Sequence, residues 1–363
     1  MTQTPSRTLD LTRDVALLTA ELMDIESVSG NERELADAVE AALRALPHLE
    51  VVRDGDSIIA RTSLGRAERV LLAGHLDTVP LPTVPGSRGT VPSSWDGDVL
   101  YGRGATDMKG GVAVQLALAA GLTDPTRDVT YVFYDHEEVE ASLSGLGRLQ
   151  ESCPDWLEAD FAVLLEPTNG TVEGGCNGTM RFHATTTGRA AHSARAWMGE
   201  NAIHAAAEIL ARLRDHEPAT VSVEGLDYRE SLNAVKIWGG TAGNVIPDTA
   251  TVEINYRFAP DKSVEEAEAY VRNLLSGFEL VRTDAAAGAR PGLDQPAAAS
   301  FVAVVGQEPK PKYGWTDVAR FSALGIPAVN FGPGDALLAH TDNEHVEADA
   351  VRACLAALRT WLS

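Results

Sequence analysis

Hydrophobic residues near the start of the chain recur every three or four positions, which is the spacing of one face of a helix. The pattern covers residues 15–25 and then residues 35–46. Ser29 stands three residues before Glu32, a capping-box pattern that predicts the start of the second helix. Both helices should pack their apolar stripe against a core.

Short apolar runs rich in branched residues follow these helices. Their length and their flanks favour buried strands over helices. A helix is expected between two of the runs, over residues 111–122, so strands alternate with helices. This alternation predicts an α/β fold with a central, mostly parallel sheet. The predicted strands are residues 57–61, 69–73, 129–134 and 161–165.

The middle of the chain groups its elements differently. An alternating strand, a helix, two strands and a second helix predict a compact α+β insert of the ferredoxin-like kind. These elements are residues 180–187, 200–215, 235–239, 250–258 and 264–278. The Gly- and Pro-rich stretch 284–296 marks a connection, and the residues after it return to the alternation of strands and helices seen in the first part of the chain. We therefore expect a first domain made of residues 1–177 and 289–363, and an inserted domain of residues 178–288.

Composition and charge exclude some classes of function. The 363 residues include 52 Asp and Glu against 30 Lys and Arg, a formal net charge of -22. That excess opposes binding to nucleic acid or anionic lipid, because both partners require basic patches. No apolar run approaches the roughly 20 residues of a membrane span, and the first residues lack a signal-peptide core, so we expect a cytoplasmic protein. Three cysteines, Cys153, Cys176 and Cys354, fit a reducing compartment.

Candidate metal ligands stand where the predicted strands end. In open α/β sheets, ligands gather at the carboxyl ends of the strands. Singly, each candidate has an ordinary explanation, such as a hydrogen-bonded histidine or a solvated carboxylate. Together, five carboxylates at one sheet edge would repel one another strongly unless cations lay among them. The candidates are His75, Asp77, Asp107, Glu137, Glu138, Glu166 and His340.

Two histidines and several carboxylates, with no thiolate, suit zinc or a zinc-like metal. Two zinc ions that each keep a position open for water need about three protein ligands apiece, and a shared carboxylate satisfies that number. Asp107, in a glycine-rich turn, is the natural bridge. The other metal ligands divide into His75 and Glu166 for one ion, and Glu138 and His340 for the second.

Two carboxylates remain beside these ligands. Asp77, two residues after His75, would hold the other ring nitrogen of that histidine and set its tautomer. Glu137 is the spare carboxylate. Beside zinc-bound water, whose pKa falls towards ~7, it can take a proton as general base and hand it to a leaving amine as general acid. The residues thus predict a metal-dependent hydrolase that acts on amides.

The chain also resembles the aminoacylase, acetylornithine deacetylase and succinyl-diaminopimelate desuccinylase family of co-catalytic zinc hydrolases. The match spans nearly the whole chain, and its order and spacing are more specific than any single motif. It rests on Gly74-His-Leu-Asp-Thr-Val-Pro80, Gly104-Ala-Thr-Asp-Met-Lys-Gly-Gly111, Glu137-Glu138 and Glu166-Pro-Thr168. Residues 314–327 and 330–335 look most like the succinyl-diaminopimelate desuccinylase branch found in actinobacteria.

The resemblance implies a zinc-aminopeptidase-like catalytic domain, an inserted lid and dimerisation domain, and the metal ligands given above. It implies hydrolysis of N-succinyl-LL-2,6-diaminopimelate to succinate and LL-2,6-diaminopimelate, in lysine and cell-wall precursor biosynthesis. Two Zn²⁺ are the expected cofactors, for which Co²⁺ or Mn²⁺ could substitute. The expected partners are a small anionic N-acyl amino acid and a second copy of the chain, bound through the lid, without nucleic acid or membrane.

The resemblance also adds lid residues that spacing alone does not supply. His192 matches the lid histidine that in dimeric members reaches the partner subunit's active site and stabilises the oxyanion. Asn244 and Arg257 match lid positions that contact substrate, and Arg257 is placed to hold a carboxylate. Taken without the family, Arg257 would be read as a surface arginine.

One segment departs from the desuccinylase pattern. Where many members carry paired arginines for the substrate carboxylates, this chain has Thr-Met at 179–180 and only then Arg181. Arg181 is therefore the expected substrate contact there, and Arg195 or Arg320 could replace the lost charge. Gly325, within the segment typical of the desuccinylase branch, is a further expected substrate contact.

Two alternatives remain open on the sequence. The chain could be an acetylornithine deacetylase, or another N-acyl-amino-acid deacylase or dipeptidase of the same family, because the metal ligands do not distinguish substrates. A different class is a non-catalytic metal-binding protein on this fold. Glu137 argues against that class, because a binding module has no use for a spare carboxylate beside the metals.

Overall fold

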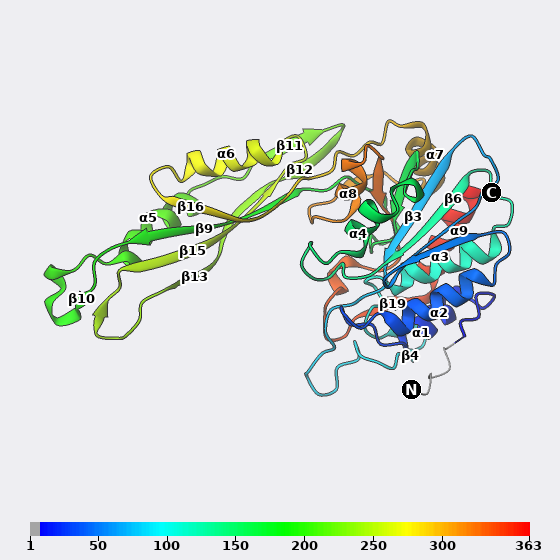
Figure 1. Cartoon of the computed structure of the whole chain (residues 1–363), viewed down its shortest axis with the longest axis horizontal. Coiled ribbons are helices and arrows are strands. Elements are labelled where there is room, and N and C mark those ends of the chain that lie inside the picture. Colours follow the sequence, from blue (N-terminus) through cyan, green and yellow to red (C-terminus); the bar gives the residue numbers. More distant parts are fainter. Residues whose placement is uncertain (1–7) are drawn as a thin grey trace. The chain divides into compact units, whose positions relative to one another are not determined.

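The computed structural model of the protein describes residues 8–363, and contacts among its elements divide the chain into two units (Figure 1). Unit 1 holds the chain up to Gly174 together with Gly292–Lys310 and Arg320–Ser363. Unit 2 holds Gly175–Pro291 and Pro311–Ala319. Residues 1–7, where the sequence shows the start of a segment without a signal-peptide core, lie outside the described residues.

An eight-stranded sheet forms the centre of unit 1. In pairing order its strands are β1 (Glu50–Asp54), β2 (Ser57–Arg61), β6 (Asp128–Tyr134), β3 (Arg69–His75), β7 (Phe161–Leu164), β18 (Ala328–Asn330), β8 (Glu173–Gly174) and β17 (Lys310–Pro311). The central strands β6, β3, β7 and β18 pair in parallel, whereas β1, β2 and β8 pair antiparallel with their neighbours. The expected α/β class is confirmed. A smaller sheet holds β4 (Ser94–Asp96), β5 (Val99–Tyr101) and β19 (His345–Glu347).

Helices bury their apolar residues against this sheet. Those that share its main core are α1 (Val15–Met23), α2 (Arg33–Arg44), α3 (Lys109–Gly121), α7 (Pro296–Val305) and α9 (Ala348–Leu362). α3 is the most deeply buried, because it is apolar on nearly every side. Gly111 lets the first turn of α3 approach the end of β7, since a Cβ there would lie 2.3 Å from the carbonyl oxygen of Leu165. The remaining helices of unit 1 are α4 (Gly145–Ser152), η1 (Pro154–Trp156) and η3 (Ala336–Leu338).

The predicted capping box at the start of α2 is wrong. The helix begins at Arg33, and its N-cap residue Glu32 makes no side-chain cap hydrogen bond. The hydroxyl of Ser29 donates instead to the carboxylate of Asp77, at 2.6 Å. Ser29, which the local pattern assigned as the helix cap, therefore donates to a buried carboxylate in the loop after β3 and does not cap α2.

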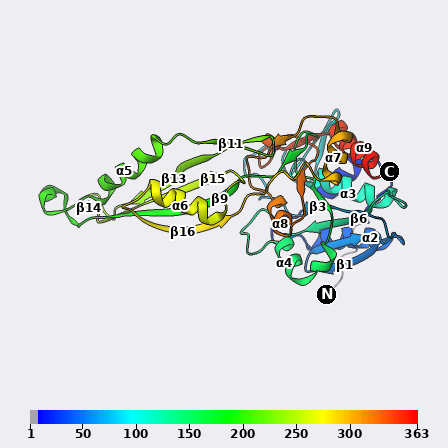
Figure 2. The same ribbon diagram turned by 90° about the horizontal axis from the view of Figure 1, so that it is seen from above.

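Unit 2 is built on an antiparallel sheet. In pairing order its strands are β13 (Ser231–Gly239), β15 (Thr249–Phe258), β9 (Gly178–Thr187) and β16 (Glu279–Ala286). Helices α5 (Ala202–Arg214) and α6 (Val264–Leu274) pack apolar residues on one face of these strands (Figure 2). The order strand, helix, strand, strand, helix, strand is the ferredoxin-like arrangement expected for the insert. Shorter elements are β10 (Ala191–His192), η2 (Ser193–Met198), β11 (Thr220–Val223), β12 (Leu226–Arg229) and β14 (Val245–Ile246).

Two segments differ from the sequence expectation. Strand β16 was not expected, and its last residues extend into the stretch 284–296 that the sequence indicates as a connection. Only Leu280 of this edge strand is buried, so its hydrophobic pattern is weak. Residues Pro311–Ala319, expected in the first domain, cluster with unit 2. The backbone N–H of Asn177 donates to the carbonyl of Lys312, and the indole N–H of Trp315 donates to the carbonyl of Ala287. The segment ends in the first residues of α8 (Val318–Ala323), a helix whose remaining residues belong to unit 1.

Among residues 8–363, no helix combines the length and the apolar character that crossing a membrane requires. The three cysteines are free thiols, of which Cys176 and Cys354 are buried and Cys153 is partly exposed.

Candidate metal centre

The carboxyl ends of parallel strands bring most of the predicted ligands together in unit 1. His75 is the last residue of β3 and pairs with Tyr134, the last residue of β6. Glu137 and Glu138 follow closely after β6, and Glu166 follows closely after β7. Because neighbouring parallel strands end side by side, the residues that follow them meet at one edge of the sheet.

Asp107 and His340 reach the same edge from connecting segments. Nε2 of His75 lies 3.0 Å from Oδ1 of Asp107, and Nε2 of His340 lies 3.4 Å from Oδ2 of the same carboxylate. Nε2 of His340 also lies 2.9 Å from Oε1 of Glu138. Asp107 thus presents one oxygen to each histidine, which is the arrangement that a bridging carboxylate needs.

The ligand atoms form groups in which all atoms lie within 4.8 Å of one another. One group is His75, Asp107 and Glu166, and another is Asp107, Glu138 and His340. These coincide with the two ligand sets that the sequence suggests, and Asp107 belongs to both. Glu137 falls in a third group, with His75 and Glu138.

The acidic surroundings of this edge strongly favour positive charge. Burial acts to lower the pKa of His75, but the hydrogen bond to Asp107 and the neighbouring carboxylates raise it well above its usual value. Hydrogen bonds to Asp107 and Glu138 raise the pKa of His340 to about 10. Burial acts to raise the pKa of Asp107, yet the two histidines hold it well below its usual value. A donor set that retains protons so firmly also fits divalent cations, which would displace those protons.

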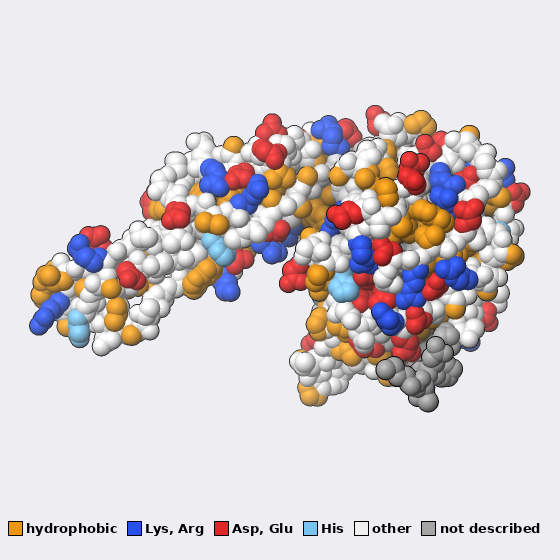
Figure 3. Space-filling model, viewed as in Figure 1, with side chains coloured by type: hydrophobic (Ala, Val, Ile, Leu, Met, Phe, Trp, Pro, Cys, Tyr) orange, Lys and Arg blue, Asp and Glu red, His pale blue; other side chains and the backbone are white. Residues whose placement is uncertain are grey.

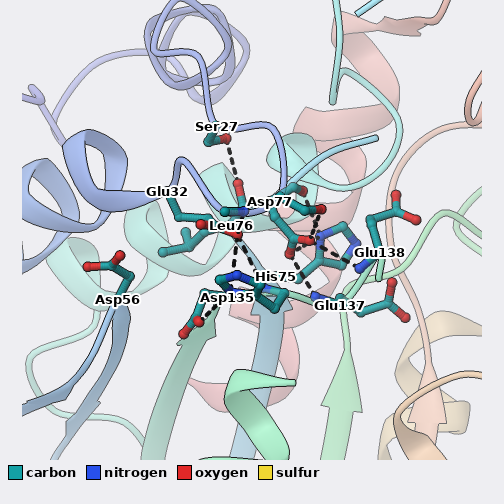
Figure 4. Close-up of polar contacts among 12 residues, drawn as sticks. Ser27, Glu32, Asp56, His75, Leu76, Asp77, Asp135, Glu137 and Glu138 are labelled. Atoms are coloured by element: carbon teal, nitrogen blue, oxygen red, sulfur yellow. Dashed lines mark hydrogen bonds and ion pairs between the residues drawn. The ribbon is translucent and has the colours of Figure 1, made fainter. Parts of the chain in front are cut away.

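Asp77 organises the backbone beside the ligands, between His75 and the chain at Glu137 and Glu138 (Figure 4). Its carboxylate accepts from the N–H of Glu137 at 2.9 Å, from the N–H of Glu138 at 3.0 Å, and from the hydroxyl of Ser29. The sequence suggests that this carboxylate holds Nδ1 of His75. Instead, Nδ1 lies 2.9 Å from the main-chain oxygen of Asp77 and 3.6 Å from Oδ1, because the carboxylate is already engaged by three donors.

Comparison with known proteins agrees with this geometry. The pattern described as peptidase family M20/M25/M40 matches residues 71–363, a range that includes all the candidate ligands. The chain belongs to peptidase family M20/M25/M40. Membership confirms the resemblance seen in the sequence, and with it the expected enzyme class of metal-dependent hydrolases of amide bonds.

Two relatives match nearly the whole length of the M20 chain. The succinyl-diaminopimelate desuccinylase of Corynebacterium glutamicum is 43% identical over 366 residues, covering 98% of this chain and 98% of the relative. A Mycobacterium tuberculosis protein that carries the same name by inference is 52% identical over 357 residues, covering 98% of this chain and 99% of the relative.

Solved structures share the M20 fold. A tripeptidase from Staphylococcus aureus superposes with a TM-score of 0.78 at 20% identity, covering 98% of both chains. A Bacillus subtilis protein described as a dinuclear metal-binding peptidase of the M20 family superposes with a TM-score of 0.71 at 17% identity, covering 96% of both chains.

Four of the expected substrate-side residues of this M20 chain lie in unit 2. His192 and Asn244 are neighbours, because β10 pairs with β14 and the N–H of Ser193 donates to the carbonyl of Asn244. Arg181 on β9 and Arg257 on β15 lie on adjacent strands, and both point away from the face that α5 and α6 cover. The exposed end of unit 2 that carries β10 also shows hydrophobic side chains (Figure 3), among them Trp197 at 78% exposure.

The expected role of Gly325 in substrate binding is not supported by its position. Gly325 precedes β18, which runs parallel to β7 with Ala328 opposite Ala162. The residue therefore lies at the amino-terminal edge of the sheet, opposite to the edge that holds Glu166. Arg320, which the sequence offers as a replacement charge, donates to the carbonyl of Ala141 in unit 1.

The sequence analysis did not identify Arg103 and Glu344 of the M20 chain as a buried pair. Arg103 and Glu344 form an ion pair with Nη1 and Oε2 2.8 Å apart, and their side chains are 4% and 1% exposed. An arginine inside a glycine-rich turn and a carboxylate shortly after His340 are the only local signals. Neither signal says that the two side chains meet.

Proposed function

We propose that this protein hydrolyses the amide bond of N-succinyl-LL-2,6-diaminopimelate and releases succinate and LL-2,6-diaminopimelate, a step of lysine and cell-wall precursor biosynthesis. The observation that carries the reaction class is the carboxylate of Asp107 between two histidines, with the carboxylate of Glu137 close to His75 and Glu138 of the same cluster. The choice of acyl group is supported by the two full-length relatives that bear the desuccinylase name.

The proposed cofactors are two zinc ions. His75, Asp107 and Glu166 would hold one, and Asp107, Glu138 and His340 the other, since both groups offer the nitrogen and oxygen donors that zinc accepts. When bound, the ions polarise the amide carbonyl and lower the pKa of water. The dinuclear neighbour from Bacillus subtilis supports the number of ions, and Co²⁺ or Mn²⁺ could substitute in the same donor set.

Glu137 is the proposed proton carrier. Its carboxylate takes a proton from the attacking water and gives it to the amide nitrogen, which then leaves as a neutral amine. Asp77 binds the backbone N–H groups of Glu137 and Glu138, so it fixes the direction in which both side chains leave the main chain. Asp77 is a positioning residue in this scheme.

His192 is the proposed donor to the oxyanion that develops on the amide carbonyl. Its Nδ1 accepts a hydrogen bond from the N–H of Ala194 at 3.1 Å. That contact places the proton of the neutral ring on Nε2, which leaves Nε2 as a donor. In the proposed dimer this donor serves the active site of the partner subunit, beside Asn244 as a substrate contact.

Arg257 and Arg181 are proposed to hold the carboxylates of the substrate. Burial and the nearby charge of Arg181 lower the pKa of Arg257. Among residues 8–363, neither arginine forms an ion pair with a carboxylate, and Nε of Arg257 donates only to the amide oxygen of Asn255. Arg257 also lines a cavity of about 430 Å³ within unit 2, with Arg229 and Asn177. Arg257 is partly buried and Arg181 is exposed, and two adjacent cations that form no ion pair with a carboxylate among the described residues favour an anionic ligand.

The proposed assembly is a homodimer through unit 2. Its edge strand β13 exposes Val235, Ile237 and Trp238 at 56%, 49% and 42%. Ile203 belongs to α5, a helix that contacts β13, and is 42% exposed. An edge strand with unpaired backbone groups and apolar side chains is a surface that a second chain can cover.

The experiment that tests this function is an amine-release assay on the zinc-loaded protein. The substrates are N-succinyl-LL-2,6-diaminopimelate, N-acetylornithine and a small set of dipeptides. We expect release from the succinylated substrate at least tenfold faster, in kcat/KM, than from the others. Faster release from acetylornithine or a dipeptide would replace the proposed substrate with that alternative. Release from none of them, by a protein that binds zinc, would favour the non-catalytic metal-binding protein.

A further inference from the structure

A buried ion pair connects the two loops that carry Asp107 and His340. The side chains of Arg103 and Glu344 are 4% and 1% exposed, and Nη1 of Arg103 lies 2.8 Å from Oε2 of Glu344. The other oxygen, Oε1, accepts from the backbone N–H groups of Thr106 and Asp107, at 3.0 and 3.1 Å. Glu344 therefore uses one oxygen for Arg103 and the other for the backbone of a candidate metal ligand.

The same pair also reaches the loop of His340. Nη1 of Arg103 donates to the carbonyl of Thr341 at 3.3 Å, and the carbonyl of Glu344 accepts from the N–H of Gly102 at 3.1 Å. His340 has a backbone φ of 63°, a left-handed conformation that residues other than glycine rarely adopt. A loop in this conformation persists only when surrounding contacts hold it. The Arg103 and Glu344 contacts lie directly beside it.

We infer that Arg103 and Glu344 form a positioning clamp, which holds Asp107 and His340 at the separation that a shared metal ion needs before the ion binds. The inference rests on the proposed metal centre, since Asp107 and His340 belong to one ligand group with Glu138. Neither member of the clamp supplies an atom to any ligand group among the described residues. The clamp therefore acts through the backbone of the ligands and not on the ion itself.

A clamp differs from a pair that merely stabilises the fold. Preorganised ligands bind a metal more tightly because less ordering accompanies binding, so loss of a clamp lowers metal affinity in protein that is still folded. A purely structural pair would change the midpoint of unfolding and leave the zinc affinity of the folded protein unchanged. Zinc affinity and unfolding are therefore measured on the same samples.

The first test compares zinc affinity in full-length Glu344→Gln and unaltered protein, by competition with a chromophoric chelator on metal-free samples. We expect the affinity to fall about 10- to 100-fold, the usual effect of losing a partner that orients a metal ligand. The double variant Arg103→Met with Glu344→Gln removes both buried charges. Its midpoint of unfolding should lie closer to that of the unaltered protein than the midpoint of Glu344→Gln does. Its zinc affinity should remain as weak as that of Glu344→Gln. Affinities within twofold of the unaltered protein in both folded variants would overturn the clamp.

Asp128→Asn is the matched control. Asp128 is also a buried carboxylate that accepts from two backbone N–H groups, those of Leu64 and Arg66, and lies 3.7 Å from an arginine. It begins β6, at the end of that strand opposite to Glu137. The substitution should destabilise the protein without changing zinc affinity by more than twofold. A loss of zinc affinity equal to that of Glu344→Gln would mean that removing any buried charge weakens zinc binding, and would overturn the inference.

A second test uses the unaltered protein and does not depend on any variant folding. Hydrogen–deuterium exchange of the segment 103–108 in metal-free protein should be slow, because Glu344 already accepts from the amides of Thr106 and Asp107. Fast exchange that slows only after zinc is added would overturn the clamp. If the unaltered protein bound no zinc, the proposed function would fail, and this exchange measurement would still decide whether the clamp exists.

Discussion

The contacts of individual residues at the candidate metal centre support different proposed roles for them. The carboxylate of Asp77 accepts hydrogen bonds from two backbone N–H groups and the hydroxyl of Ser29, which fits the positioning role proposed for it. Asp107 is committed to two histidines. Glu137 lies close to His75 and Glu138, but it belongs to neither of the two ligand sets that share Asp107. Glu137 is therefore the residue that we propose for proton transfer.

At the residue scale, Glu137→Gln should separate metal binding from catalysis. The amide cannot accept the proton of the attacking water, so kcat should fall at least about 100-fold, the lower end of what general acid–base catalysis contributes. Both zinc equivalents should remain, because Glu137 is in neither ligand set. Metal analysis by mass spectrometry and the amine-release assay measure the two properties. A fully metallated variant with near-normal kcat would remove Glu137 from the mechanism.

Arg257→Gln tests local capture of the substrate carboxylate. A hydrogen bond to a charged group contributes about 1.5–3 kcal/mol, so KM should rise roughly 10- to 100-fold with little change in kcat. The control is Arg214→Gln, which removes the same charge from an exposed arginine of unit 2 that pairs with Asp215. Its KM should stay within twofold. Equal effects of the two substitutions would indicate that long-range charge, and not a local contact, governs binding.

At the scale of elements, the residues after β6 belong both to the candidate metal centre and to a network of charged residues that binds α4 to the sheet. Asp135, directly after β6, is 3% exposed and accepts from Arg148 of α4 at 2.6 Å and from Ser57 of β2 at 2.5 Å. Burial acts to raise the pKa of Asp135, but these donors and His136 lower it below its usual value. The network ties a helix and two strands together within two residues of Glu137.

Asp135→Asn should therefore destabilise unit 1 in a pH-dependent way. Because the folded-state pKa is depressed, the carboxylate contributes stability that is complete above the unfolded value of about 4 and is lost as the pH falls through the folded value. The free energy of unfolding should drop by about 3 kcal/mol at pH 7, as when one partner of a buried pair is removed, and by less near pH 3. Urea unfolding followed by tryptophan fluorescence measures both.

The control for this prediction is Asp155→Asn, an exposed aspartate of η1. It removes the same charge and should change the free energy of unfolding by less than about 0.5 kcal/mol at either pH. A loss for Asp135→Asn that is as large at pH 3 as at pH 7 would show that packing, and not the ionised carboxylate, is responsible.

At the scale of the whole molecule, the two units carry different parts of the proposed activity. Every candidate metal ligand lies in unit 1, whereas His192, Asn244, Arg181 and Arg257 lie in unit 2. Unit 2 also exposes the apolar edge strand β13. Assembly and metal content are thus properties that can be changed separately.

Ile237→Lys should convert the proposed dimer into a monomer. Ile237 lies on the edge strand β13 and is 49% exposed, and a lysine there places a charge in the covered strand edge. Light scattering after size-exclusion chromatography should report the chain mass of 38.6 kDa in place of twice that mass. Val281→Lys, on the opposite edge strand β16 at 52% exposure, is the control and should remain a dimer. Dissociation by Val281→Lys alone would move the interface to β16.

Metal removal should lower thermal stability through mass action. Zinc that binds only the folded protein adds about 2.7 kcal/mol at a free concentration 100 times its Kd, so chelation should lower the Tm by several degrees. Differential scanning fluorimetry with and without added zinc measures the shift. In Asp107→Asn most of the zinc-dependent shift in Tm should be lost, because both ligand sets share that carboxylate. An equal zinc-dependent shift in Asp107→Asn would place the stabilising metal elsewhere.

Local pattern was sufficient for the parts of this protein that depend on near neighbours in the chain. Strands such as β2, at Ser57–Arg61, could be predicted because a short buried strand reads as an apolar run. The candidate ligands followed, since residues just after parallel strands must share one sheet edge. Charge supported the same conclusion, because clustered carboxylates require cations.

Only the tertiary structure decided the features that depend on partners distant in sequence. The hydroxyl of Ser29 went to Asp77, 48 residues away, and not to the helix that follows it. Gly325 falls at the wrong edge because β18 runs parallel to β7, a direction that no local motif encodes. Arg103 meets Glu344 across 241 residues. Such contacts arise from how the sheet orders its strands and loops in space, and the energy of a buried charge depends on the partner that this order supplies.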